Sequence, residues 1–289
     1  MTLPRFVVAI VALALSAASA KAEDKQRIVV AGGALTEIVF ALGEGDRVIG
    51  VDTTSLYPEA ATERAKIGYM RQLSAEGVLS LAPDLLIASA DAGPVQALDK
   101  LRSAGLSIET APDADGLDGL YAKIRFLGAL LGRQAEAAAL SEGLAARVAQ
   151  IRSEIDATPS RPKVLAILST RGGGLMAAGA ETSALAMIEL AGGRNAVAGF
   201  DGYKPLSAEA AIAAQPEILI APEHAVEALG GIDALLARPE LAATPAGREK
   251  RVLVMDGLLL LGFGPRTPEA IERLAVFLHP EMRSEARSE

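Results

Sequence analysis

The chain has 289 residues, of which 51% are hydrophobic and 22% are charged, and its formal net charge is -8 at pH 7. This much apolar material excludes a disordered chain, and the length suits two ordinary domains or one large one. No cluster of lysines and arginines stands out, which argues against nucleic-acid binding, because neutralising phosphates needs clustered basic residues.

The rarest residue types narrow the chemistry further. The chain has no cysteine and no tryptophan, and it has two histidines and four tyrosines. Without cysteine we expect no disulfide, no thiol nucleophile, no thiolate metal site and no lipid-anchored cysteine. Any binding or catalysis must therefore depend on a short set of side chains.

The first twenty residues predict a secretory signal. Arg5 precedes an apolar run over residues 6–18, and the small residues Ala18, Ser19 and Ala20 follow. This order is typical of a cleaved signal, with cleavage expected after Ala20 or Ala22. The alternative is an uncleaved anchor, but the run is shorter than the roughly 20 residues of a membrane helix. We expect an exported protein, most simply a periplasmic one.

Beyond the signal, short apolar runs alternate with helical patterns. We expect strands over residues 27–31, 48–51, 85–88 and 107–110, and helices over 36–42, 74–80 and 95–104. Such alternation predicts an α/β fold with mostly parallel sheets.

Helix-forming residues dominate the stretch from residue 117 to 157. Gly132 and Arg133 divide it, and the second helix, over 134–156, would be roughly 35 Å long. A proline-containing segment then ends it, and strands resume at 164–168 and 218–221. We expect three parts, which are an N-terminal lobe over 21–132, a linking helix over 133–158 and a C-terminal lobe over 159–289.

An internal repeat indicates that the two lobes are similar. Residues 74–87 (SAEGVLSLAPDLLI) align without gaps with residues 207–220 (SAEAAIAAQPEILI), and a Gly-Tyr pair precedes each copy. Each copy predicts a serine-capped helix, a Pro-acid turn and an apolar strand. A chance match of a common unit is the alternative. With two similar lobes, a ligand is expected between them, at the loops that follow the strands.

An exported two-lobe chain with one helical link resembles the substrate-binding proteins of ABC importers for iron complexes and cobalamin. Within that group it is similar to the periplasmic haem-binding proteins of bacterial haem importers. The similar stretches are IGYMRQLSAEGVLSLAPD (67–84), MAAGAET (176–182) with LAGGRNA (190–196), and TPAGR (244–248) with LLGFGPR (260–266). The resemblance covers essentially the whole mature chain.

This resemblance implies transport rather than catalysis. The ligand would be ferric haem b, received from a donor such as an outer-membrane receptor. The partners would be an ABC permease and its separate ATPase subunit. The resemblance also implies a monomer that is not embedded in the membrane.

The resemblance implies that Tyr69 is the axial ligand of the haem iron. The chemistry agrees, because ferric iron is a hard acid and a phenolate oxygen is a hard ligand. Arg71 would point the same way in an extended loop, and its positive charge would favour the phenolate. From the residues alone, a tyrosine in a loop has a more ordinary interpretation as a packing residue.

Four other residues are candidates for haem contact. Tyr203 is the repeat-related tyrosine, which could face the ligand from the opposite wall or support a second haem. His224 follows a predicted strand. One interpretation is that it contacts haem or a propionate, and the other is that it is a solvated loop histidine. Some haem-binding relatives have a second-haem histidine in the loop where this chain has Arg171, which argues against two haems and makes Arg171 a candidate partner of a propionate. Arg266 either neutralises a propionate or braces the lobe.

Glu76 and Glu209 occupy the same place in the repeat, in the first turn of a helix. One interpretation is local, because carboxylates stabilise helix N-termini. The resemblance implies another, in which one acidic residue on each lobe docks onto arginines of the permease. His279 ends the last predicted helix beside Pro280, where a charged imidazole would favour the helix dipole.

Three rival functions differ in how well the residues fit them. A ferric-siderophore or cobalamin carrier would have the same fold, although both often use aromatic cages and this chain has no tryptophan. An exported α/β enzyme is less well supported, because the glycine-rich residues 171–179 do not form a P-loop and no hydrolase motif occurs. A carrier of divalent metal would need several converging histidines and acids.

Overall fold

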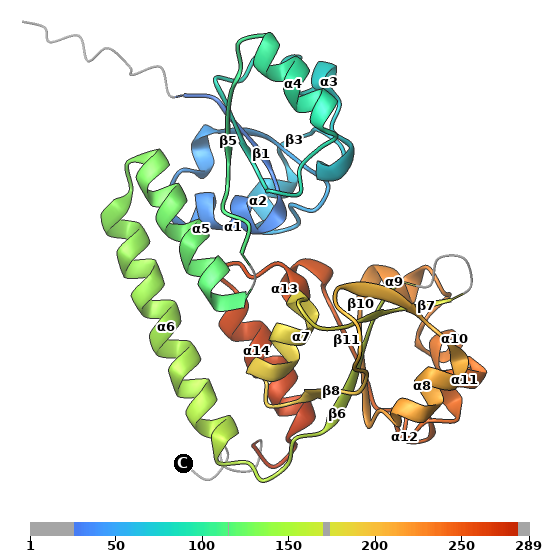
Figure 1. Ribbon diagram of the computed structural model, residues 1–289. Coiled ribbons are helices and arrows are strands. Elements are labelled where there is room, and N and C mark those ends of the chain that lie inside the picture. Colours follow the sequence, from blue (N-terminus) through green and yellow to red (C-terminus); the bar gives the residue numbers. More distant parts are fainter. Residues whose placement is uncertain (1–25, 115, 170–173, 283–289) are drawn as a thin grey trace, which may run out of the picture.

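Two β-sheets, each flanked by helices, form two lobes that are joined by long helices (Figure 1). The computed structural model describes residues 26–114, 116–169 and 174–282. The predicted signal, its cleavage points after Ala20 or Ala22, and Arg171 lie outside these residues.

The first sheet has the strand order β3-β2-β1-β4-β5, and every neighbouring pair is parallel. The strands are β1 (Ile28–Ala31), β2 (Val48–Val51), β3 (Ala65–Lys66), β4 (Leu85–Ala88) and β5 (Ser107–Thr110). The helices of this lobe are α1 (Gly33–Ala41), α2 (Glu59–Thr62), α3 (Ala75–Leu79) and α4 (Val95–Ser103), with short 3-10 turns at Gly45–Arg47 and Met70–Gln72. All residues of β1 and β4 are buried, which is why both strands are continuous apolar runs.

The second sheet has the order β11-β10-β6-β7-β9, and β8 also pairs with β6. Its strands are β6 (Lys163–Ser169), β7 (Leu175–Ala178), β8 (Arg194–Asn195), β9 (Tyr203–Leu206), β10 (Ile218–Pro222) and β11 (Val252–Met255). β7 runs antiparallel to both of its neighbours, β6 and β9, and the other described pairs of this sheet are parallel. The helices are α7 (Ser183–Leu190), α8 (Ala208–Ala214), α9 (Glu223–Glu227), α10 (Ile232–Leu236), α11 (Pro239–Ala242), α12 (Pro245–Arg248), α13 (Gly257–Leu261) and α14 (Thr267–Leu278). The predicted α/β fold with mostly parallel sheets is confirmed.

Two helices lie between the sheets in the chain, α5 (Gly116–Leu131) and α6 (Gln134–Asp156). The break between them is at Gly132, whose φ of 71° is in the left-handed region that glycine tolerates best. Arg133 pairs with Glu44 of the first lobe. Further along α6, Arg147 pairs with Glu272 of α14 at 2.8 Å. The predicted range of the second helix, 134–156, is confirmed.

One apolar core extends through both lobes. A single buried cluster includes Ile28 of β1, Ile124 of α5, Ile151 of α6, Val164 of β6 and Leu274 of α14. Each sheet also packs against a smaller cluster on the face that is turned away from this core, one cluster for the first sheet and one for the second. Because the large cluster is shared, moving one lobe far from the other would expose apolar surface to water.

The internal repeat is confirmed in the backbone. The hydroxyl oxygens of Ser74 and Ser207 each accept a hydrogen bond from the backbone N–H three residues later, at 3.3 and 3.2 Å. After each of the two helices the chain passes through a left-handed residue, with φ of 45° at Ala82 and 46° at Gln215. The two copies therefore have the same cap and the same turn.

The acidic residues of the two turns also have equivalent roles. The Asp84 carboxylate accepts a hydrogen bond from the backbone N–H of Arg27 at 2.7 Å, just before β1. The Glu217 carboxylate accepts one from the backbone N–H of Lys163 at 3.1 Å, at the start of β6. Each Pro-acid turn thus ties its strand to the first strand of its own lobe.

His279 follows α14 as predicted, but its environment differs from the expectation. The ring is completely buried, and its Nδ1 lies 3.2 Å from the hydroxyl of Ser160. Burial lowers the pKa of His279, with the nearby carboxylate of Glu281 opposing that shift. The ring is therefore neutral at pH 7, and the expectation of a charged imidazole at the helix end is wrong.

This buried histidine predicts a loss of stability in acid. Because the pKa of His279 is lowered by folding, the unfolded chain takes up this proton first as the pH falls below about 6.5. We expect the urea midpoint to fall between pH 7 and pH 5, and the His279→Gln variant to show a smaller fall. His224→Gln, which makes the same change at an exposed histidine, is the control for the substitution itself. An unchanged pH dependence in His279→Gln would contradict the assignment.

Candidate functional site

Tyr69 lies at the carboxyl edge of the first sheet, just after β3. The chain enters this position through Gly68, whose φ is 88°, and the Tyr69 side chain is about one-third exposed. Arg71 Nη1 donates a hydrogen bond to the Tyr69 hydroxyl at 2.6 Å. The predicted meeting of the two side chains is confirmed, but they meet across the 3-10 turn at Met70–Gln72 and not along an extended loop.

Asp91 completes this group from the loop that follows β4. Arg71 Nη2 donates to the Asp91 carboxylate, so the guanidinium lies between a hydroxyl and a carboxylate. Burial opposes the charge on Arg71, but its bonds to Tyr69 and Asp91 outweigh burial and raise the pKa of Arg71. The guanidinium is therefore a permanent cation held against the Tyr69 oxygen.

Backbone hydrogen bonds join the loop that follows β3 to the loop that follows β4. Gly93 donates to the carbonyl of Met70 at 2.9 Å, and Leu73 donates to the carbonyl of Gly93 at 2.7 Å. No local pattern in the sequence connects Asp91 with Tyr69, because β3 and β4 are not neighbours in the sheet. Its position in the chain could have marked it as a candidate, because Asp91, like Tyr69, closely follows a strand.

A buried carboxylate organises the loop after β2. Asp52 is completely buried, and its oxygens accept hydrogen bonds from Gly32 N at 3.0 Å, Thr54 N at 2.9 Å and Ser55 Oγ at 2.8 Å. The Thr54 hydroxyl in turn accepts from Gly33 N at 3.1 Å. Because these bonds satisfy the first amides of α1, that helix begins at Gly33 and not near residue 36 as predicted.

Arg266 reaches from the start of α14 to the first lobe. Its Nη2 donates to Glu37 Oε1 at 2.5 Å, and its guanidinium carbon lies 3.9 Å from the ring centroid of Tyr57. Glu37, on α1, is only 4% exposed, and its Oε2 has no hydrogen-bond partner among the described residues. Burial raises the pKa of Glu37, and Arg266 opposes that shift. The observed contacts are those of a brace between the lobes.

The carboxyl ends of the two sheets face each other at this brace. A methyl group on Gly33, the first residue of α1, would lie 2.7 Å from the Leu258 side chain of α13. Since α1 follows β1 and α13 follows β11, the two helices can meet only where the strand ends meet. Tyr69 and Asp91 lie in loops that leave such strand ends, and Arg266 lies between α13, which follows β11, and α14.

Among the remaining candidates, His224 also follows the carboxyl end of a strand, β10, whereas Tyr203 begins its strand. Tyr203 is the first residue of β9 and is about 40% exposed. His224 is exposed in the first turn of α9, and a methyl group on Gly257 would lie 3.1 Å from its Nδ1. Glu76 and Glu209 are exposed in the first turns of α3 and α8.

The described residues contain no group of three or more His, Cys, Asp or Glu side chains that could hold a bare metal ion. A metal that arrives within its own chelate needs only one or two protein ligands, and Tyr69 offers one such oxygen. Within the same residues, no helix combines the length and apolarity needed to cross a membrane.

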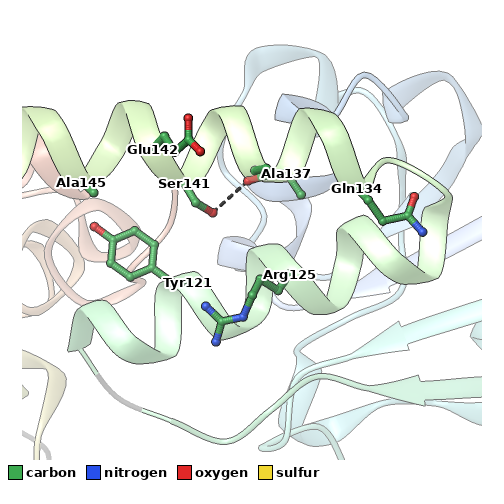
Figure 2. Close-up of a pocket in the computed structure, with 8 residues that line it drawn as sticks. Tyr121, Arg125, Gln134, Ala137, Ser141, Glu142 and Ala145 are labelled. Atoms are coloured by element: carbon green, nitrogen blue, oxygen red, sulfur yellow. Dashed lines mark hydrogen bonds between the residues drawn. The ribbon is translucent and has the colours of Figure 1, made fainter.

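A groove of about 530 Å³ lies elsewhere, between α5 and α6 (Figure 2). It is lined by Tyr121 and Arg125 of α5 and by small residues of α6, including Ala137, Ser141 and Ala145. The Ser141 hydroxyl donates to the Ala137 carbonyl of its own helix at 2.8 Å. The groove shares no lining residue with the candidate site.

Residues 28–258 match the family model described as "Periplasmic binding protein". The chain belongs to the periplasmic binding protein family. It is similar in structure to the periplasmic heme-binding protein BhuT in complex with two hemes, with a TM-score of 0.84 and 42% identity over 89% of this chain and 99% of that chain.

Two curated relatives of this periplasmic binding protein have related descriptions. An uncharacterized ABC transporter substrate-binding lipoprotein, YvrC of Bacillus subtilis, is 28% identical over 90% of this chain and 82% of its own. A cobalamin-binding protein of Halobacterium salinarum is 29% identical over 89% of this chain and 70% of its own.

The brace between the lobes predicts unequal effects of substitution. In this periplasmic binding protein, Arg266→Ala leaves the buried Glu37 carboxylate without its cation, which costs about 3–5 kcal/mol for a buried pair. Replacing both residues by apolar ones, Glu37→Leu with Arg266→Met, should cost less than Arg266→Ala alone. Urea denaturation of the ligand-free protein measures both.

The control is Arg102→Ala, which breaks an exposed pair with Asp99 on α4. Exposed pairs contribute at most about 1 kcal/mol. If Arg266→Ala destabilises the protein no more than Arg102→Ala, the brace does not hold the lobes together.

Proposed function

We propose that this protein captures ferric haem between its lobes in the periplasm and delivers it to an ABC permease. The observation that carries the proposal is the 2.6 Å hydrogen bond from Arg71 to the Tyr69 hydroxyl. The 42% identity to a heme-binding protein along almost its whole length supports the choice of haem. Its family consists of solute-binding proteins, which favours capture over catalysis.

In this proposal Tyr69 supplies the axial oxygen ligand of the iron. Haem brings four nitrogen ligands of its own, so the absence of a multi-residue metal site in the described chain fits this ligand. A phenolate binds ferric iron better than a phenol does, and the adjacent guanidinium stabilises the negative oxygen. Asp91 holds the second arm of Arg71 and so orients the first.

The other candidate residues have supporting roles in the proposal. Tyr203 and His224 would contact the ligand from the second lobe. Arg266 is already paired with Glu37, so a propionate that reached it would compete for the same guanidinium. Arg171 would pair with a propionate as well, and it lies outside the described residues.

The proposal includes the organisation of the exported chain. We propose lobes over residues 21–132 and 159–289, joined by a linking helix over 133–158, and a signal that is removed after Ala20 or Ala22. The loaded protein would be a monomer that carries haem b from an outer-membrane donor to a permease with its ATPase subunit. Glu76 and Glu209 would contact arginines of that permease.

Cobalamin transport is the second candidate function. The similarity to a halobacterial cobalamin-binding protein, over 89% of this chain and 70% of that protein, favours it. The Tyr69–Arg71 contact favours haem, because it prepares a hard oxygen ligand for ferric iron. The two functions differ in a direct titration.

Titration of the mature protein with hemin tests the proposal. We expect saturable binding of one equivalent with a high-spin ferric spectrum of tyrosine ligation. Tyr69→Phe removes the ligating oxygen but keeps the ring, so it should lose that spectrum. It should weaken binding by at least about 100-fold, which is the upper range for changes to residues that only support a metal ligand. Tyr121→Phe, the same change in the groove between α5 and α6, is the control and should bind as the wild type does.

Two outcomes would contradict the proposal. One is a Tyr69→Phe protein with unchanged spectrum and affinity. The other is tight binding of cyanocobalamin with no binding of hemin, which would establish the second candidate function.

The Tyr69–Arg71–Asp91 group predicts a graded series of variants. Arg71→Ala removes a charged hydrogen bond to the ligating oxygen, and because Arg71 is half exposed we expect a loss of about tenfold in hemin affinity. Asp91→Asn breaks only an exposed ion pair, so its loss should stay below about fivefold.

Acidification separates a charge effect from a purely structural one. Protons compete with iron for the Tyr69 oxygen, so the pH at which the tyrosine-ligated spectrum is half lost should be higher in Arg71→Ala than in the wild type. Arg71→Lys keeps the charge and should lie between them. Equal pH midpoints in the wild type and Arg71→Ala would show that Arg71 does not stabilise the phenolate.

A further inference from the structure

Two exposed aliphatic side chains occupy equivalent positions in the two copies of the repeat. Leu79 ends α3 and Ile212 lies on α8, and each is 38% exposed. One exposed aliphatic residue on a protein surface needs no explanation. Equivalent exposure in both lobes suggests a shared role.

Core packing does not explain this pair. The preceding residues of the repeat, Val78 and Ala211, are completely buried and account for the contact of each helix with its own lobe. The next residues differ in type, with Ser80 in one copy and alanine in the other. The two copies of the repeat therefore share an exposed aliphatic residue at Leu79 and Ile212, whereas the residue that follows it differs between the copies.

Each aliphatic residue adjoins one of the equivalent glutamates. Glu76 precedes Leu79 by three residues and Glu209 precedes Ile212 by three residues, and residues at this spacing are neighbours on a helix surface. We call these residues the α3 patch (Glu76 and Leu79) and the α8 patch (Glu209 and Ile212). In Figure 1 both helices lie on the sides of their lobes away from α6.

The charge of the patches indicates the kind of partner. Hydrogen bonds from its own backbone N–H and from the Ser207 side chain lower the pKa of Glu209, so it is ionised at neutral pH. A negative patch is repelled by anionic lipid headgroups and attracts basic groups of a protein. An aliphatic neighbour adds apolar contact and excludes water from the ion pair, as in the centre of protein interfaces.

We propose that Leu79 and Ile212 form the apolar part of a two-point docking surface, in which each side chain is buried against the permease beside its glutamate. The partner is a membrane protein with two similar basic and apolar surfaces, one for each patch. This inference rests on the proposed function. It adds an apolar contribution to docking beside that of the glutamates. Such a contribution is needed because an exposed ion pair alone changes affinity by only about fivefold.

The test compares docking with hemin binding in the same preparations. Full-length mature protein is titrated, with and without hemin, against the cognate permease–ATPase complex in nanodiscs. We expect Leu79→Ala/Ile212→Ala to weaken docking at least about tenfold through faster dissociation, with unchanged hemin affinity and urea midpoint. Ile232→Ala, which shortens a 44% exposed residue on α10, is the control and should dock as the wild type does.

Salt dependence distinguishes the two parts of each patch. Glu76→Gln/Glu209→Gln should flatten the dependence of docking on salt, whereas Leu79→Ala/Ile212→Ala should keep the wild-type slope at lower affinity. This difference would support an apolar contribution that is separate from the charges.

Two results would overturn the inference. One is wild-type docking by Leu79→Ala/Ile212→Ala while the glutamate variant is impaired. The other is a wild-type dimer that this double variant converts to a monomer, because a second copy of the chain would then occupy the patches. Failure of the wild type to bind hemin would overturn the proposed function instead, and the docking of the ligand-free protein would remain measurable.

Discussion

The arrangement of this protein depends on the apolar core that its two lobes share. Strands β1 and β6, the helices α5 and α6, and α14 all contribute to one buried cluster. Burial of apolar surface is the main favourable term in folding, so separating the lobes would cost stability that neither lobe recovers alone. Ion pairs also attach the α6 region to both lobes. Arg133 pairs with Glu44 of the first lobe, and Arg147 pairs with Glu272 on α14 of the second. We therefore expect only a small opening motion when a ligand enters.

This constraint determines where polar chemistry can gather. The carboxyl ends of the two sheets face each other. Loops that leave these ends carry Tyr69 and Asp91, and Arg266 lies nearby between α13 and α14. Hydrogen bonds to the buried Asp52 hold the loop that follows β2 against the start of α1. The resulting site has a hard oxygen with a permanent cation beside it, and no multi-residue metal site occurs among the described residues.

Local signals in the sequence predicted most of the secondary structure. The strands over 48–51, 85–88 and 107–110 and the helix over 134–156 coincide with the structure, because apolar runs and glycine or proline boundaries lie within a few residues of each other. The repeat predicted two similar lobes, and the caps and turns confirm it. The partners of the site residues were not found. Asp91 lies 20 residues from Arg71, and Glu37 lies 229 residues from Arg266, and no periodic pattern connects such positions.

The sequence by itself determined the fold class and the repeat, because each depends on neighbouring residues or on recognisable motifs. Tyr69 and Arg71 were chosen through the resemblance to haem-binding proteins, and their role in binding stays a prediction. The tertiary structure decided which groups are paired and which are buried. It gave Arg71 a carboxylate partner, placed Arg266 between the lobes against Glu37 and Tyr57, and buried His279 so that its ring is neutral. The physical reason is that charge states and ion pairs depend on solvent exposure and on distance in space, and both are set only when remote segments pack together.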